Sequence, residues 1–336
     1  IMDDCNDTTN HTTMSLTGGA QPVKVTPEMV AQLKSSLLDV TQPIAKRFRS
    51  LFTLRNLGGE MSIEAMSSAL NDESALLRHE IAYCLGQMTD RRAIDVLVEI
   101  VKNLAEHPMV RHEAAEALGA IGDTVALETL KKYSQDGTRE VAETCQLALS
   151  RVEWYAVNEP ASFENKAYLS VDPAPSLPTS VPFETVKNDF LNGELDIFNR
   201  YRALFSLRDR GDEASVLALC EAFKDASALL KHEVAFVLGQ LQHRAALPAL
   251  TAVLADARES AMVRHEAAEA LGAIASTETV PLLEQFIKDP EPIVSESCLI
   301  ALDVTEYFNN TEEFQYADGI KILLEKANPQ AVTNHA

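Results

Sequence analysis

The chain contains internal repeats, and this property limits the folds that it can adopt. The segment Arg47–Arg55 returns in closely similar form as Arg200–Arg208, and the run Met109–Ile121 returns unchanged as Met262–Ile274. Both repeats are displaced by 153 residues (47 to 200, 109 to 262), and a shorter period of 33 residues lies inside each half (79 to 112, 232 to 265). A period of roughly 30 to 50 residues made of two helical patterns is typical of an α-solenoid.

We therefore predict an all-α solenoid made of two duplicated halves, each with four helix pairs. The helical patterns of the first half cover residues 27–40, 43–57, 60–70, 74–88, 91–105, 109–121, 123–134 and 138–155. Five prolines, at positions 160, 173, 175, 178 and 182, then interrupt the pattern, because proline prevents a continuous helix. The expected organisation is a disordered amino tail (1–26), an N-terminal half (27–155), a linker (156–182), a C-terminal half (183–304) and a C-terminal tail (305–336).

Composition agrees with a helical chain and narrows the class of partner. Aromatic residues make up only 6% of the chain, and the formal net charge is −21. Such an acidic protein is poorly suited to nucleic acid, since phosphates attract Lys and Arg, and it favours a basic partner instead. No stretch approaches the roughly 20 apolar residues that span a membrane, and the polar amino tail does not resemble a signal peptide.

The cysteines indicate a compartment. Their number is odd, their spacing is long and their surroundings are helical: Cys5, Cys84, Cys145, Cys220 and Cys298. These properties are typical of buried free thiols rather than of a disulfide framework. We expect a cytoplasmic protein.

The dipeptide His-Glu occurs four times, in register with both repeat periods. The four His-Glu motifs begin at His79, His112, His232 and His265, so they hold half of the eight histidines. Imidazole beside carboxylate is a ligand set for first-row transition metals, and two equivalent pairs predict two metal ions. A lone His-Glu on a helix is usually a solvated pair, but four copies in register favour the metal site.

Helical geometry predicts how the motifs pair. At 100° per residue, His79 and Glu80 share one wedge of their helix, and the opposite face is apolar. Equivalent helices of successive repeats pack about 8–10 Å apart, a gap that two side chains bound to one ion can span. We expect His79 and His112 to hold one metal, and His232 and His265 to hold the other. The long proline-rich linker lets the two halves face each other, so the two ions can approach across a pseudo-twofold axis.

The residue pattern leaves three functions open. Nitrogen and oxygen ligands without thiolate favour Fe, Mn, Co or Zn, and two metals suit either a hydrolase or a dioxygen-activating di-iron centre. Zinc or manganese would favour a dinuclear metal hydrolase. A non-catalytic protein-binding scaffold is the third possibility, because many solenoids act as binding surfaces.

Together, the four motifs and the phrases that surround them resemble a known family. Leu-Arg-His-Glu-Ile-Ala-Tyr (77–83) and Val-Arg-His-Glu-Ala-Ala-Glu-Ala-Leu-Gly-Ala (110–120), on duplicated helix pairs of the HEAT type, are similar to deoxyhypusine hydroxylase over about residues 43–304. The resemblance implies a di-iron monooxygenase with two Fe per chain. It would use O2 and an external reductant to hydroxylate deoxyhypusine, a modified lysine of a basic eukaryotic translation initiation factor, to hypusine.

The resemblance also implies roles for individual residues. One iron would be held by His79, His112 and Glu113, and the other by His232, His265 and Glu266. Glu80 and Glu233 would face the substrate as catalytic and substrate-binding carboxylates, because deoxyhypusine carries two ammonium groups that carboxylates can pair with. Glu116 and Glu269 lie one turn after the second and fourth histidines and are expected either to orient the imidazoles or to be surface charges. Tyr83 lies on the same wedge as His79 and could donate a hydrogen bond at the metal site, which its counterpart Phe236 cannot do; the preferred interpretation is that both are packing residues.

Overall fold

The computed structural model describes residues 13–14, 23–158 and 168–309, and these residues are mainly helical. The predicted all-α fold is confirmed. The one pair of strands in this part of the chain joins Thr13–Met14 (β1) to Val23–Lys24 (β2) in antiparallel register. The chain forms two compact units, residues 1–69 with 314–336 and residues 70–313. The tails expected at 1–26 and 305–336 lie mostly outside the described residues.

The first unit contains three described helices. They are α1 (Pro27–Leu38), α2 (Ile44–Leu57) and α3 (Gly59–Ser67). Helix α1 begins where the sequence predicts, because the Thr26 side chain accepts a hydrogen bond from the Met29 amide and Pro27 occupies the first helical position. Leucines from the inner faces of α1 and α2 are fully buried, among them Leu37, Leu51 and Leu54.

The second unit contains the remaining helices. They are α4 (Ala75–Gln87), α5 (Ile94–Lys102), α6 (Pro108–Ile121), α7 (Leu127–Tyr133), α8 (Arg139–Val157), α9 (Phe183–Leu191), α10 (Ile197–Arg210), α11 (Glu213–Glu221), α12 (Ala228–Leu241), α13 (Leu247–Ala255), α14 (Ala261–Ile274), α15 (Val280–Phe286) and α16 (Pro292–Asn309). Short 3-10 turns precede α5, α7, α13 and α15, at Arg91–Ala93, Thr124–Ala126, Arg244–Ala246 and Thr277–Thr279, and a fifth, Ala222–Lys224, follows α11.

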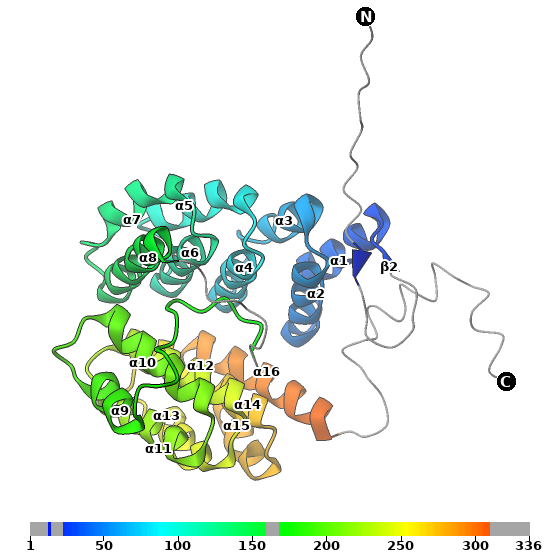
Figure 1. Ribbon diagram of the computed structural model, residues 1–336. Helices are drawn as coiled ribbons and strands as arrows, with labels where there is room; N and C mark the ends of the chain where they lie inside the picture. Colours follow the sequence, from blue (N-terminus) through cyan, green and yellow to red (C-terminus); the bar gives the residue numbers. More distant parts are fainter. Residues whose placement is uncertain (1–12, 15–22, 159–167, 310–336) are drawn as a thin grey trace, which may run out of the picture. The chain divides into compact units, whose positions relative to one another are not determined.

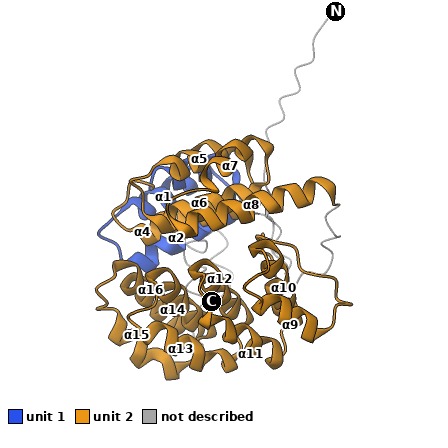
Figure 2. Ribbon diagram, turned by 90° about the vertical axis from the view of Figure 1, so that its left-hand side faces the viewer, with its two compact units in different colours: residues 1–69, 314–336 blue, residues 70–313 orange. Residues whose placement is uncertain are grey.

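Even-numbered helices form the inner layer of the second unit, and odd-numbered helices form its outer layer. Each inner helix packs on the next one along the chain, α4 on α6, α6 on α8, α12 on α14 and α14 on α16. The row α4–α8 and the row α9–α16 lie on opposite sides of the unit, with their inner helices facing each other (Figures 1 and 2). Contacts of α8 with α10 and α12, and of α16 with α4, join the two rows.

The segment between α8 and α9 contains no helix over its described residues 168–182. This finding agrees with the four prolines at 173, 175, 178 and 182. We call residues 168–174 the linker strap. Its residue Ala174 is fully buried.

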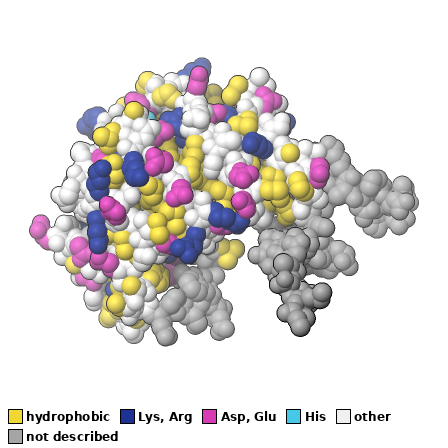
Figure 3. All heavy atoms as spheres, turned by 90° about the horizontal axis from the view of Figure 1, so that it is seen from above, with side chains coloured by type: hydrophobic (Ala, Val, Ile, Leu, Met, Phe, Trp, Pro, Cys, Tyr) yellow, Lys and Arg dark blue, Asp and Glu magenta, His cyan; other side chains and the backbone are white. Residues whose placement is uncertain are grey.

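Charged side chains of both signs lie scattered over one face of the molecule. On the face shown in Figure 3, Lys and Arg side chains are interspersed with Asp and Glu, and apolar side chains lie between them. Within the described residues, no helix is both long and apolar enough to span a membrane.

Candidate metal centre

Each His-Glu motif lies in the second turn of an inner helix. The motifs of α4 and α12 follow serine N-caps, since Ser74 accepts a hydrogen bond from the Leu77 amide and Ser227 accepts one from the Leu230 amide. Because the cap fixes where each helix begins, it also fixes the direction in which the motif side chains project. The equivalent helices thus present equivalent residues.

All eight motif side chains are buried. Their exposed fractions are 0 to 6% for His79, Glu80, His112, Glu113, His232, Glu233, His265 and Glu266. The wedge that holds the imidazole and carboxylate therefore faces the interior of the unit. It does so because the inner helices of the two rows face each other (Figure 1).

The four imidazoles form a single cluster. Five of the ring pairs have centroids 5.3 to 6.0 Å apart, and these pairs join rings within each row as well as rings across the two rows. The equivalent rings of His79 and His232 lie 6.0 Å apart, and the equivalent rings of Tyr83 and Phe236 are also 6.0 Å apart. Residues that meet their own counterparts mark a pseudo-twofold axis between the rows.

The same symmetry relates the carboxylates. His79 Nε2 lies 3.3 Å from Glu113 Oε2, and the equivalent distance from His232 Nε2 to Glu266 Oε2 is also 3.3 Å. Glu266 Oε2 lies 4.0 Å from His265 Nε2 as well. Each of these glutamates is thus placed beside the histidines with which the sequence groups it.

The substrate-facing candidates lie beside the cluster. Glu80 Oε1 is 3.3 Å from His79 Nδ1, on the side of the ring opposite the contact with Glu113. Glu233 is buried, and its Oε1 makes no hydrogen bond to any described residue. Glu80 and Glu233 are therefore next to the imidazoles, on the same two helices as the first and third histidines.

Burial controls protonation in the cluster. Loss of solvent lowers the pKa of His112 and His265 well below the ordinary value and lowers the pKa of His232 to about 4, and the neighbouring imidazoles add to the effect. Burial also opposes charge on His79, but the carboxylates of Glu113 and Glu80 outweigh it and raise the pKa of that imidazole. Neutral imidazole is the form that binds a metal.

The carboxyl groups are affected in the opposite direction. Burial raises the pKa of Glu116, Glu233 and Glu266 well above the usual range, and the neighbouring carboxylates raise each pKa further. A cation placed among these groups would reverse that effect and favour the charged carboxylates. The buried carboxyl groups of the cluster are therefore suited to surround a bound cation.

The donor atoms fit metal ions. Both ring nitrogens of His112 and Nε2 of His265 make no hydrogen bond within the described residues, whereas both ring nitrogens of His79 and Nε2 of His232 lie 3.3 Å from carboxylate oxygens. Buried polar atoms without any partner are rare in folded proteins, and coordination to a metal would satisfy them. Ligand atoms of His79, His112 and Glu113 lie within 4.8 Å of one another, as do those of His79, His232 and His265.

The second of these groups differs from the predicted pairing. The sequence pattern assigns His79 to the first half alone, whereas the structure places its ring within reach of both histidines of the second half. The two expected metal positions are therefore neighbours in one cluster. The sequence predicts that the halves face each other and that the two ions approach, but it does not predict that His79 itself lies within reach of both His232 and His265.

Comparisons with known proteins agree with the fold and with the motifs. A family model of HEAT repeats matches residues 30–104, 63–150 and 216–303, and a model of the PBS lyase HEAT-like repeat matches residues 200–225. The deoxyhypusine hydroxylase of Dictyostelium discoideum is 71% identical over 306 residues, which cover 90% of this chain and 97% of the relative. The chain belongs to the deoxyhypusine hydroxylase family.

Mammalian relatives and a solved structure extend this agreement. The human deoxyhypusine hydroxylase is 51% identical, with 89% of this chain and 98% of the relative covered. The structure of the human enzyme in complex with glycerol superposes with a TM-score of 0.80 at 51% identity, covering 83% of this chain and 96% of that one. The family predicted from the His-Glu motifs is confirmed.

In this member of the deoxyhypusine hydroxylase family, the linker strap is bound by both rows of helices. Val171 exchanges hydrogen bonds with the Gln87 side chain at the end of α4, and the equivalent Gln240 donates to Ser170 Oγ. Arg208 of α10 forms a bidentate ion pair with Asp172, with both N···O distances 2.7 Å. Equivalent glutamines of the two halves thus hold one shared segment.

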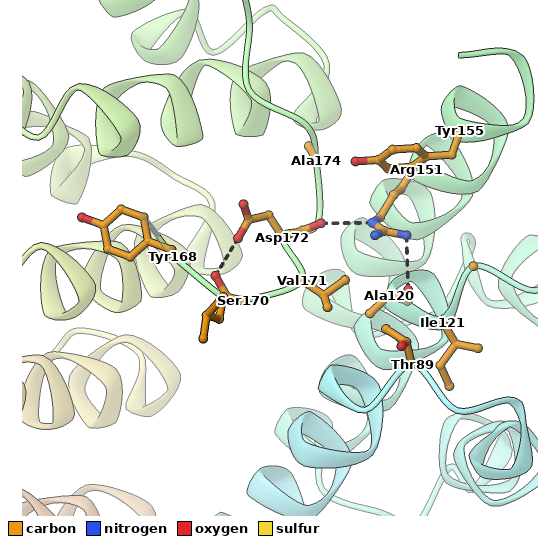
Figure 4. A pocket seen from close by; sticks show the side chains of 12 residues that line it. Thr89, Ala120, Ile121, Arg151, Tyr155, Tyr168, Ser170, Val171, Asp172 and Ala174 are labelled. Carbon is orange, nitrogen blue, oxygen red and sulfur yellow. Dashed lines mark hydrogen bonds between the residues drawn. The ribbon is translucent and has the colours of Figure 1, made fainter. Parts of the chain in front are cut away.

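A cavity of about 690 Å³ lies on the strap (Figure 4). Arg151 crosses its floor, donating from Nε to the Asp172 carbonyl and from a terminal nitrogen to the Gly119 carbonyl, while Tyr155 and Tyr168 form part of its wall. None of the eight motif residues lines this cavity. It is therefore separate from the candidate metal centre.

Two reciprocal hydrogen bonds join the rows elsewhere. Ser74, the N-cap of α4, donates to Glu296 of α16, and Ser227, the N-cap of α12, donates to Glu143 of α8. The serines are equivalent positions of the duplication, and so are the glutamates (74 to 227, 143 to 296). These contacts were not predicted, although the identical residues at matching positions of the two halves are a signal that could have indicated them.

Proposed function

We propose that the chain is a deoxyhypusine hydroxylase whose metal centre is the four-histidine cluster. The observation that carries this proposal is the burial of four mutually adjacent imidazoles with two symmetry-related glutamates, in a chain 71% identical to a relative of that name. The chemistry would be hydroxylation of the deoxyhypusine side chain of a protein substrate to hypusine.

Two iron ions are the proposed cofactor. His79, His112 and Glu113 would hold one ion, and His232, His265 and Glu266 would hold the other. When bound, the iron pair would supply the redox chemistry with O2, using two electrons from an external reductant. The fit rests on the orphaned ring nitrogens and on the absence of thiolate from the donor set within the described residues.

Glu80 and Glu233 are proposed to bind the substrate. Deoxyhypusine has two ammonium groups, and buried carboxylates form charge-assisted hydrogen bonds with such groups. The free Oε1 of Glu233 is available for one of them. Because burial and nearby carboxylates raise the pKa of Glu233, an arriving ammonium group would favour its ionised form.

The partner is proposed to be a basic eukaryotic translation initiation factor in the cytoplasm. The net charge of −21 supports attraction of a basic protein and opposes binding of nucleic acid. The described cysteines, Cys84, Cys145, Cys220 and Cys298, are free thiols, which supports a reducing compartment. A role at a membrane is not proposed.

The two halves of the duplication, residues 27–155 and 183–304, are proposed as the functional units joined by the linker 156–182. They differ from the compact units of the fold, whose boundary falls after Ala69. The proposal rests on the motifs, because each half would supply two histidines and one glutamate to the centre.

Metal content combined with turnover tests the proposed function. The purified protein should contain about two irons per chain by elemental mass spectrometry, and should hydroxylate the deoxyhypusine form of the factor in the presence of O2 and reductant. Replacement of any motif histidine by Ala should lower bound iron and abolish turnover. His243→Asn is the matched control, since His243 caps a 3-10 turn through its ring nitrogen and is not one of the motif histidines.

Other outcomes would favour the alternatives. Two zinc or manganese ions, with no activity after reconstitution with iron, would indicate a hydrolase. A protein that takes up no metal after anaerobic purification and reconstitution would indicate a protein-binding scaffold.

A further inference from the structure

The two proposed metal positions have different surroundings at equivalent histidines. His265 and His112 are counterparts in the duplication (112 to 265). The next inner helices, α16 and α8, carry Ser297 and Thr144 at matching positions (144 to 297). All four residues are buried. The hydroxyl groups are therefore placed alike but belong to different residue types.

In the second half, the hydroxyl connects the imidazole to a carboxylate. Ser297 Oγ donates a hydrogen bond to Glu269 Oε1 at 2.8 Å and lies 3.4 Å from His265 Nδ1. Because the hydroxyl has a single proton, which goes to Glu269, its oxygen can only accept from the ring. This arrangement puts the ring proton on Nδ1 and leaves the Nε2 lone pair directed toward the cluster.

The carboxylate strengthens this arrangement directly. Glu269 Oε1 lies 3.6 Å from His265 Nδ1, one turn along the same helix. Metal-binding histidines commonly give their second ring N–H to such a hydrogen-bond chain, which fixes the tautomer and makes the ligand nitrogen more basic. The sequence predicts that Glu269 could orient the imidazole of His265. In the structure, the hydroxyl group of Ser297 lies between the two side chains and links them.

In the first half, the equivalent connection is not made. Thr144 donates its single hydroxyl proton to the Glu140 carbonyl of its own helix at 2.8 Å, so it cannot also donate to Glu116. Neither ring nitrogen of His112 has a hydrogen-bond partner among the described residues. Nothing in that part of the chain therefore selects the tautomer of His112.

We propose that Ser297 is a positioning residue which, with Glu269, makes the two metal positions unequal. The position that includes His265 binds its metal more tightly than the position that includes His112. This inference rests on the proposed metal ligands, but it concerns the difference between the two positions rather than their existence.

Stepwise binding of Co(II) to the metal-free full-length protein tests the proposal. Calorimetry and visible absorption should resolve two binding steps that differ in affinity. Ser297→Ala should weaken the tighter step about 10- to 100-fold, the usual effect of losing a hydrogen-bond partner of a metal ligand. Thr144→Ala, the matched control, should leave both steps unchanged.

A second pair of variants tests the same proposal in case Ser297→Ala does not fold. Glu269→Gln removes the charge at the end of the chain of hydrogen bonds, and Glu116→Gln removes the equivalent charge in the first half. The first variant should weaken the same step as Ser297→Ala, and its helical circular dichroism should match that of the wild type.

The results separate two kinds of failure. Two bound Co(II) ions with equal losses in Ser297→Ala and Thr144→Ala, or with no loss in either, would overturn the inequality and leave the ligand assignment standing. Failure of the wild type to bind two ions would overturn the ligand assignment and the inequality together.

Discussion

At the scale of single residues, four glycines determine how closely the inner helices approach. Each lies against an alanine of the next inner helix, in the pairs Gly86 with Ala117, Gly119 with Ala148, Gly239 with Ala270 and Gly272 with Ala301. A side-chain carbon on Gly272 would lie only 2.6 Å from Ala301 Cα. Since the motif histidines lie on these same helices, the glycines also set the spacing between these histidines.

Gly272→Ala should therefore destabilise the protein by about 1–3 kcal/mol, a typical effect of overpacking in a core. The contact with the Ala301 backbone cannot be relieved by a side-chain rotation, so α14 and α16 must separate. Urea unfolding measures the change. Gly137→Ala is the control, because nothing lies within 4 Å of a carbon added there; equal losses in both variants would contradict the packing explanation.

Glu80 offers a second prediction at this scale. If it binds the substrate rather than the metal, Glu80→Gln should reduce kcat/KM about 10- to 100-fold through loss of an ion pair worth about 1.5–3 kcal/mol. Bound iron should stay near the wild-type level. Elemental analysis beside steady-state kinetics checks both parts, and loss of iron as complete as in His79→Ala would show that Glu80 is a ligand.

At the scale of helices, a repeated arginine joins three consecutive elements. Arg111, Arg200 and Arg264 each donate from Nε to a carbonyl ten residues earlier, near the end of the preceding outer helix. Each also forms an ion pair with an aspartate 25 residues later, namely Asp136, Asp225 and Asp289. The arginine thus donates to a backbone carbonyl near the end of the outer helix, and its ion pair holds the loop that precedes the next inner helix.

The ion pair of Asp136 predicts a dependence of stability on pH. The hydrogen bond from Arg111 lowers the pKa of this carboxyl in the folded protein, whereas the unfolded pKa is about 3.9. The stabilisation is therefore complete above the unfolded pKa and is lost as the pH falls through the folded pKa.

Asp136→Asn should lower the free energy of unfolding at pH 7 by about 1.5–3 kcal/mol. Below about pH 4, the free energy of unfolding of this variant should fall less steeply with pH than that of the wild type. Unfolding by urea between pH 2.5 and 7 measures both effects. The exposed Asp95→Asn in α5 is the control. A variant whose stability varies with acid pH as steeply as the wild type would exclude Asp136 as a source of that dependence.

At the scale of the whole molecule, net charge governs the encounter with the proposed substrate. A chain of charge −21 attracts a basic protein over a distance that salt shortens, since the Debye length falls from about 30 Å at 0.01 M to about 10 Å at 0.1 M. Raising the ionic strength should lower kcat/KM several-fold and change kcat little. Steady-state kinetics in NaCl series would check this, and equal decreases in both constants would exclude electrostatic attraction as the cause.

The sequence allowed prediction of the helices and of the family, because both depend on periodic patterns. The predicted segment 109–121 coincides with α6 (Pro108–Ile121) to one residue, and the family is confirmed by relatives of the same name. The approach of the two halves across a pseudo-twofold axis was predicted from the proline-rich linker. The grouping of His79 with both His232 and His265 was not, because it depends on the detailed packing of the two rows. The contact between Ser297 and Glu269 was also missed, since it depends on which acceptor a single hydroxyl selects.

The pseudo-twofold axis has a consequence for how the protein can evolve. In a symmetric pair of identical chains, every substitution occurs at both equivalent positions, so the two sides of a shared centre must stay alike. Here both sides belong to one chain, so each side can change alone. The equivalent positions already differ at Tyr83 and Phe236, and at Thr144 and Ser297. Duplication within one chain therefore lets the two sides of the shared centre specialise independently.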